Sequence, residues 1–289
     1  MFEKKSYTHQ LLTKFKCLSQ VVLAVLALIM PSVATAQINT AQMLNIGRNA
    51  MYFEDYVLAI QYFNQVIAAK PYLAESYFYR AVAKINLDDY QGAEEDCNKA
   101  LEINPFMVDA YQVRGIARQV QRKERLAISD YESALKFLPE EKAFWLNKAV
   151  CEESLKEYAA SDSSYSKLLR IAPNYDRAYL GRAQLRLAMG DSIRALEDVN
   201  KSLEIEKSNP SAYVIKADIE MNSKHDYKAA LADMDEAIKL EPHFAGYFIN
   251  RAYMKYNLDD YFGAMADYNY AVDLDPMNLA AHFNRGLLL

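Results

Sequence analysis

Residues able to carry chemistry are sparse in this chain and do not form a complete catalytic pattern. Ser164 and Lys167 match the S-x-x-K pattern of enzymes that use a nucleophilic serine, but the companion motifs are absent from the sequence. His225, His243 and His282 lack the spacing of metal ligands. Glycine-rich phosphate loops and the H-E-x-x-H and C-x-x-C patterns do not occur either. The sequence therefore predicts a protein that is not an enzyme and that binds neither a cofactor nor a metal ion.

Along the chain, a lysine or arginine is repeatedly followed by an aspartate sixteen or seventeen residues later. The pairs are Arg80 and Asp96, Arg114 and Asp130, Arg182 and Asp198, Lys216 and Asp233, and Arg251 and Asp267. Ile46 and Tyr62 take both places at the start of the series, whereas Lys148 is followed by Ser164. The cations could form a ladder that binds anions, or each could form an ion pair with its aspartate. We favour the structural ion pair, because the two charges tend to change together.

The spacing of these pairs reflects a tandem repeat. After Pro31, prolines occur at positions 71, 105, 139, 173, 210, 242 and 276, at intervals close to 34 residues. A fixed period of this length is typical of repeat proteins. The 289 residues contain only 8 glycines and 8 prolines, which disfavours turn-rich β folds and glycine-rich nucleotide-binding folds. With 52% hydrophobic and 25% charged residues, the chain can bury a core.

Each period contains two segments with helical spacing. In the second repeat, Tyr77 is the large residue at position 4, and Ala81 and Ala93 are the tiny residues at positions 8 and 20. Turn residues such as Asp88 and Asp89 lie between the two segments. Each repeat is therefore predicted to be a helix, a tight turn, a second helix and a loop. The seven repeats are 40–73, 74–107, 108–141, 142–175, 176–209, 210–244 and 245–278, and 279–289 is the first helix of a truncated eighth.

This pattern resembles the tetratricopeptide repeat (TPR) family, for example in the segment D-D-Y-F-G-A-M-A-D-Y-N-Y-A-V-D-L-D-P at 259–276. The resemblance covers residues 40–289. It implies an all-α fold, namely a right-handed α-solenoid of tandem helix-turn-helix units, whose concave face is lined by the first helices of the repeats. It also implies a role in binding proteins or peptides rather than in catalysis.

In this family the concave surface comes mainly from positions 2, 5, 6, 9, 12 and 13 of the first helices. Many of these residues are apolar here, and an exposed apolar strip often marks a binding site. The predicted groove residues are Phe78, Val82, Ile85, Ile116, Leu146, Val150 and Leu180, with a further region at Ile249, Tyr253 and Tyr256. The alternative is that these side chains only pack neighbouring first helices against one another.

The first 36 residues have the features of a secretory signal. Lysines precede an apolar run at 21–30, Pro31 ends that run, and the small residues Ala34 and Ala36 precede Gln37 at the predicted cleavage site. The uncharged stretch 17–36 is also long enough to span a bilayer, so an uncleaved membrane anchor is the alternative. We expect the protein in the periplasm or cell envelope of a Gram-negative bacterium.

The charge of the chain restricts its partners. The formal net charge is -5, and loss of four lysines and one glutamate with the signal would leave about -8. This acidity disfavours nucleic acids and anionic membrane surfaces. We expect a non-catalytic interaction scaffold that binds a protein or peptide segment in its groove. The alternative is an N-terminal recruiting module of a longer envelope or secretion protein, such as an enzyme, because 286–289 lacks the polar capping helix of a solenoid end.

Overall fold

The computed structural model describes residues 40–288, which contain helices, turns and loops but no strand. Residues 40–52 are helical. The helices that follow are α2 (Tyr56–Ala69), α3 (Ala74–Ile85), α4 (Tyr90–Ile103), α5 (Val108–Val120), α6 (Glu124–Phe137), α7 (Lys142–Ser154), α8 (Tyr158–Ile171), α9 (Asp176–Ala188), α10 (Ser192–Ile205), α11 (Pro210–Lys224), α12 (Tyr227–Leu240), α13 (Ala245–Asn257), α14 (Tyr261–Leu274) and α15 (Leu279–Leu287). The predicted signal, including Ala34, Ala36 and Gln37, lies outside the described residues.

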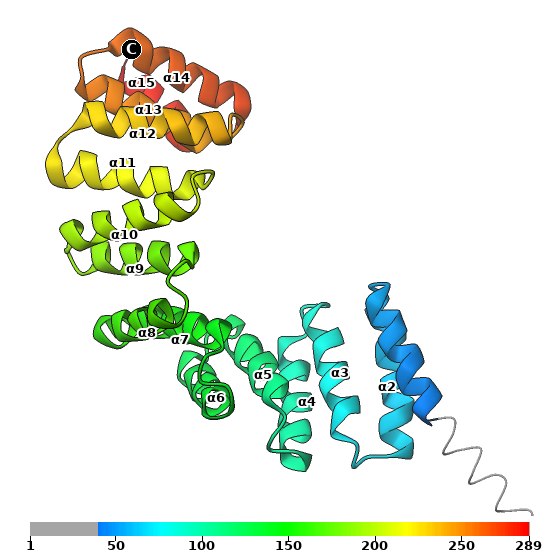
Figure 1. Ribbon diagram of the computed structural model, residues 1–289. Helices are drawn as coiled ribbons and strands as arrows, with labels where there is room; N and C mark the ends of the chain where they lie inside the picture. Colours follow the sequence, from blue (N-terminus) through cyan, green and yellow to red (C-terminus); the bar gives the residue numbers. More distant parts are fainter. Residues whose placement is uncertain (1–39, 289) are drawn as a thin grey trace, which may run out of the picture. The chain divides into compact units, whose positions relative to one another are not determined.

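The helices come in pairs that follow the sequence repeat. The first helices α3, α5, α7, α9, α11, α13 and α15 begin at the residues where the second to eighth repeats begin. The chain divides into two compact bodies, an N-terminal body that ends at Lys123 and a C-terminal body that starts at Glu124. Within each body, consecutive helices pack against one another in chain order (Figure 1). The fold is therefore an all-α solenoid of tandem helix-turn-helix units.

The tiny residues at positions 8 and 20 allow close contact between the two helices of a repeat. Ala81 and Ala93 are fully buried, and they form one core cluster with Cys97 and Ala117. At Gly47, the position-8 residue of the first repeat, an added Cβ would lie 2.5 Å from the Phe63 ring. Larger side chains at these positions would overpack the interface, at a cost of about 1–3 kcal/mol.

The regularly spaced prolines also join successive repeats through their carbonyl groups. The hydroxyl groups of Tyr77 and Tyr111 donate to the carbonyl oxygens of Pro71 and Pro105, at 3.1 and 3.2 Å. In the C-terminal body, the indole N–H of Trp145 donates to the Pro139 carbonyl oxygen at 2.8 Å. In these three repeats, position 4 thus supplies both a large ring for packing and a donor that holds the preceding loop.

The turn inside each repeat contains one residue in the left-handed region. These residues are Glu54, Asp88, Arg122, Lys156, Gly190, His225 and Asp259. An aspartate commonly follows and caps the second helix, as Asp191 does by accepting from the Arg194 N–H at 3.1 Å. The sixth repeat accommodates its extra residue by extending α11 to Lys224, so that His225 takes the left-handed position.

Replacing Lys156 by glycine should stabilise the C-terminal body by about 0.5–1 kcal/mol. Lys156 has φ 61°, a conformation that costs a residue with a Cβ more than it costs glycine. The gain is partly offset by the larger entropy of the unfolded glycine variant. Urea unfolding followed by circular dichroism measures it. Gly190→Ala, at φ 79°, is the reverse control and should destabilise the protein; equal stability of both variants to the parent would contradict the expected backbone strain.

Candidate functional site

Four of the five predicted ion pairs lie within a single body, and all four are formed. The shortest distances between nitrogen and oxygen are 2.5 Å for Arg80–Asp96, 2.7 Å for Arg182–Asp198, 2.8 Å for Lys216–Asp233 and 2.7 Å for Arg251–Asp267. The four aspartates are buried. Arg114 and Asp130 belong to different bodies, each of which is described by itself. Within the N-terminal body, Arg114 donates to the Asn98 side chain at 2.7 Å.

The same cations also contact the preceding repeat and an aromatic ring of their own helix. Arg182 donates to the Ser166 hydroxyl at 3.0 Å, and its guanidinium lies 5.8 Å from the Tyr179 ring centre. Arg251 pairs with Asp235 at 2.8 Å and lies 5.3 Å from the Phe248 ring centre. These contacts engage the guanidinium groups within the solenoid, so the geometry favours the structural interpretation over a ladder that binds anions.

A second cation, at position 11, completes the charge cluster, and sequence reasoning missed it. Lys84, Arg186 and Lys255 lie 2.8, 2.6 and 2.8 Å from Asp96, Asp198 and Asp267, respectively. In the fourth repeat, position 11 is Glu152, which pairs with Lys148 at 3.5 Å and accepts a hydrogen bond from Ser164 at 2.7 Å. Ser164 therefore has a structural role in the fourth repeat, where the acid of the cluster stands at position 11 instead of position 23.

The sixth repeat has acids at both positions. Asp233 pairs with Lys216 at 2.8 Å, while Glu220 lies 3.9 Å from the same lysine. Glu220 is buried, and its Oε2 atom has no hydrogen-bond partner among the described residues. Burial, together with the adjacent Asp233 carboxylate, raises the pKa of Glu220 to about 7. The two acids share Lys216 as their ion-pair partner, and Lys224 is a further cation whose charge acts on Glu220.

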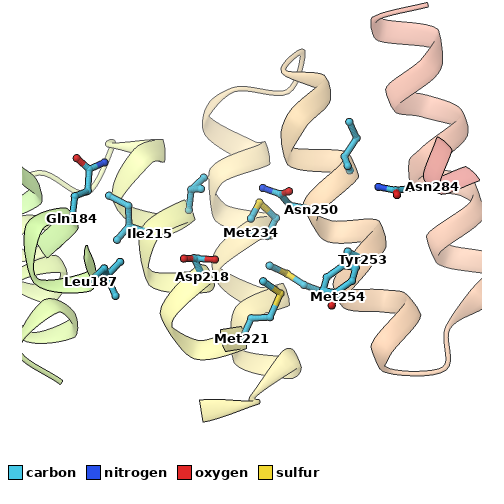
Figure 2. Close-up of a pocket in the computed structure, with 12 residues that line it drawn as sticks. Gln184, Leu187, Ile215, Asp218, Met221, Met234, Asn250, Tyr253, Met254 and Asn284 are labelled. Carbon is cyan, nitrogen blue, oxygen red and sulfur yellow. The ribbon is translucent and has the colours of Figure 1, made fainter. Parts of the chain in front are cut away.

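A cavity of about 450 Å³ opens in the C-terminal body, mainly between the first helices of successive repeats (Figure 2). It is lined by Gln184 and Leu187 of α9, Val214, Ile215, Asp218 and Met221 of α11, Met234 of α12, Ile249, Asn250, Tyr253 and Met254 of α13, and Asn284 of α15. The side chains labelled in Figure 2 point from these helices into one space. The volume and the mostly apolar lining are typical of a binding site.

The predicted groove residues of the C-terminal body differ in location. Ile249 and Tyr253 line the cavity, and Tyr253 is 47% exposed. Val150 lines an adjoining depression that shares Gln184 with the cavity. Tyr256 lines a smaller depression that shares Tyr253 and Asn284.

Other predicted groove residues serve mainly in packing. Leu180 is only 9% exposed, because it packs into the core with residues of α10 and α11, and this removes it from the groove. Leu146 is half-buried against the core formed by α7, α8 and α9. In the N-terminal body, Phe78 and Ile85 are half-buried against neighbouring core clusters, and Val82 and Ile116 are also half-buried. Phe78, Ile85, Leu146 and Leu180 therefore contribute to packing, as the alternative interpretation expects.

The polar groups of the cavity have unused hydrogen-bonding capacity. Within residues 40–288, the side-chain amides of Gln184, Asn250 and Asn284 form no hydrogen bond with the protein. The Asp218 side chain is exposed and accepts a hydrogen bond from Asn222 at 2.5 Å. The cavity thus combines an apolar floor with amides and one carboxylate that can contact a ligand.

Comparison with known proteins decides the family. Models described as "Tetratricopeptide repeat" match residues 74–107 and residues 113–176, which lie within the second to fifth repeats. The chain therefore contains tetratricopeptide repeats. Repeats of this family typically mediate protein–protein interaction. None of the curated proteins compared with this TPR protein matches it.

Solved structures share the fold at low sequence identity. The C-terminal part of a TPR repeat-containing protein from Cytophaga hutchinsonii has a TM-score of 0.70 and 18% identity, over 83% of this TPR protein and 98% of that chain. A tetratricopeptide repeat protein from Parabacteroides merdae has a TM-score of 0.66 and 16% identity, over 86% and 98%. PilF of Pseudomonas aeruginosa has a TM-score of 0.61 and 19% identity, over 74% and 97%. At these identities the likeness concerns the fold.

The part of the TPR protein between residues 40 and 288 offers little other chemistry. It contains no group of three or more His, Cys, Asp or Glu side chains placed to bind a metal ion. Burial raises the pKa of the Cys151 thiol to about 12, which disfavours the reactive thiolate. No helix in this part of the chain combines the length and the apolar character needed to cross a membrane.

Proposed function

We propose that this protein is a non-catalytic interaction scaffold that holds a segment of another protein in the cavity of its C-terminal body. One observation carries the proposal: an apolar cavity of about 450 Å³ opens between first helices, beside amides that form no hydrogen bond within the described residues. Of its three methionines, Met221 is half-buried and has a flexible side chain that can adapt to the shape of a bound group, whereas Met234 and Met254 belong to the buried core. Amides beside an apolar floor suit a polypeptide, which presents side chains and backbone groups together.

We further propose that the scaffold acts in the periplasm or cell envelope of a Gram-negative bacterium. The basic, apolar and small-residue segments before Gln37 support export. Fractionation of a bacterium that expresses the full chain, followed by N-terminal sequencing of the mature protein, tests this location. A mature protein that begins at Gln37 in the periplasmic fraction is expected. An intact N-terminus in the cytosolic fraction would contradict export.

Blocking the cavity should abolish capture of the partner. Asn250 is exposed and lines the cavity, so Asn250→Trp should fill the space without disturbing the core. We expect recovery of cross-linked partners from envelope extracts to fall by about tenfold, which corresponds to about 1.4 kcal/mol of binding free energy. Ala232→Trp, at an exposed position of α12 outside the cavity, is the matched control.

A photo-crosslinking residue placed at 250 or at 232 localises the contact directly. Cross-links from position 250 but not from position 232 are expected. Undiminished capture by folded Asn250→Trp protein, or equal cross-linking from both positions, would contradict docking in this cavity. Circular dichroism shows whether each variant is folded.

A further inference from the structure

We infer that the segment bound in this cavity is extended and places a lysine or arginine next to a bulky apolar residue. The inference rests on the proposed function, because it assigns the chemistry of the segment that the cavity would hold. Three features carry it: the charge of the lining, the unpaired amides and the apolar floor.

The charge complement of the cavity is a cation. Asp218 is the only charged residue among those that line it. Its carboxylate is exposed and accepts a hydrogen bond from the neutral Asn222, and no lysine or arginine among residues 40–288 forms an ion pair with it. By contrast, the position-23 aspartates Asp96, Asp198, Asp233 and Asp267 each have at least one lysine or arginine partner. The chain as a whole also has a formal net charge of -5, which adds to the attraction for a basic segment.

The amides indicate the backbone conformation of the segment. Gln184, Asn250 and Asn284 come from α9, α13 and α15, and Figure 2 shows Gln184 and Asn284 at the two ends of the labelled side chains with Asn250 between them. Each amide can both donate and accept a hydrogen bond. An extended segment has backbone N–H and C=O groups available for such bonds, whereas a helix satisfies most of its own. The geometry therefore favours an extended segment.

The apolar floor indicates a large side chain beside that cation. Leu187, Val214 and Ile215 lie on the side of α9 and α11, and Met254 and Ile249 on the side of α13. Burying a leucine, methionine or phenylalanine side chain here would remove apolar surface of both partners from water. A small or polar side chain would leave the floor unfilled.

Synthetic peptides test this chemistry directly. The probes are fluorescein-labelled 11-residue peptides of glycine, serine and threonine, with a central leucine flanked on both sides by arginine, glutamine or glutamate. Each Kd is measured by fluorescence anisotropy as the labelled peptide is titrated with residues 37–289, which is the chain without its predicted signal. The arginine peptide is expected to bind about tenfold more tightly than the glutamate peptide at low salt, with the difference shrinking as salt rises. Replacing the central leucine by alanine should weaken binding by at least about tenfold.

Variants of Asp218 assign the charge preference to that residue. Asp218→Asn should reduce the preference for arginine to less than about threefold, and Asp218→Lys should reverse it. Asp273→Asn, which removes an exposed charge from α14 outside the cavity, is the matched control and should leave the preference unchanged. Equal binding of arginine and glutamate peptides to the parent protein, or an arginine preference that survives Asp218→Asn, would overturn the inference alone.

The blocking variant separates failure of the inference from failure of the proposed function. Both proposals fail if every peptide binds equally well to the parent protein and to Asn250→Trp. They also fail if no peptide binds more tightly than a control peptide that lacks apolar residues, because the cavity then does not hold segments of this kind. If Asn250→Trp abolishes binding while the charge series shows no preference, the cavity binds a segment and only its predicted charge is wrong.

Discussion

Asp198→Ala should destabilise the C-terminal body by about 3–5 kcal/mol, the usual cost of removing one partner from a buried charge cluster. Asp198 is only 3% exposed. It accepts from Nε and Nη2 of Arg182 at 2.8 and 2.7 Å, and from Nη1 of Arg186 at 2.6 Å. Without the carboxylate, two largely buried guanidinium groups lose their shared partner, and Arg186 keeps only Asp162, at 3.2 Å, as an ionic contact.

Urea unfolding monitored by circular dichroism measures this loss. The control is Glu204→Ala, which removes the exposed pair between Lys201 and Glu204 at 2.6 Å. The control should cost less than about 1 kcal/mol, because exposed pairs are screened by water. A loss of the same small size for Asp198→Ala would show that the buried cluster contributes little to stability.

The fourth repeat supplies a rescue variant for the same cluster. There the acid stands at position 11, as Glu152, and position 23 is Ser164. Introducing Asp198→Ser together with Arg186→Glu transfers this arrangement to the fifth repeat. The double variant should be more stable than the sum of the two single effects predicts, by more than about 1 kcal/mol. It should remain below the parent, because Arg186 also contacts Asp162. Additive effects would contradict the coupling between positions 11 and 23.

The repeats and the pattern of paired charges are visible in the sequence because both recur with a fixed period. Ala81 and Ala93 mark helix contacts in the same way as their equivalents in other repeats, and Arg182 with Asp198 repeats the pattern of Arg251 with Asp267. Position 11 escaped notice because it changes sign: it is Arg186 in one repeat and Glu152 in another. The structure shows its role, because Arg186 and Glu152 each contact the residue at position 23 of their own repeat.

The cavity was harder to predict, because position in a repeat does not fix exposure. Leu180 and Ile249 occupy the same position 5, yet Leu180 is buried among Val199 and Ala212, whereas Ile249 borders the cavity. The difference depends on how completely the other side chains fill the space between neighbouring first helices. An apolar pattern does not mark the polar residues Asp218 and Asn250, although they supply a carboxylate and an amide to the cavity.

Glu220→Gln should stabilise the protein by about 2–3 kcal/mol at pH 8. Burial and the Asp233 carboxylate raise the pKa of Glu220 from an ordinary 4.5 to about 7, so between these two pH values the folded protein holds a proton there that the unfolded chain has lost. The contribution of Glu220 to stability is therefore greatest below about pH 4.5 and is lost as the pH rises toward 7. Above that, the folded protein must keep two carboxylates beside Lys216. Glutamine removes one of those charges while keeping the shape of the side chain.

The gain from Glu220→Gln should therefore disappear at low pH, and this dependence separates charge from packing. Urea unfolding of the parent and the variant between pH 4 and pH 8 measures it: near pH 4 the two stabilities should agree, because Glu220 is protonated in both states. Glu152→Gln is the matched control at the same position of the fourth repeat. Because Glu152 accepts from Ser164 and pairs with Lys148, its loss should cost about 1–2 kcal/mol at pH 8. A gain of equal size at pH 4 and pH 8 would mean that Glu220 acts through packing, whereas opposite effects of the two variants at pH 8 follow from the charge balance of each cluster.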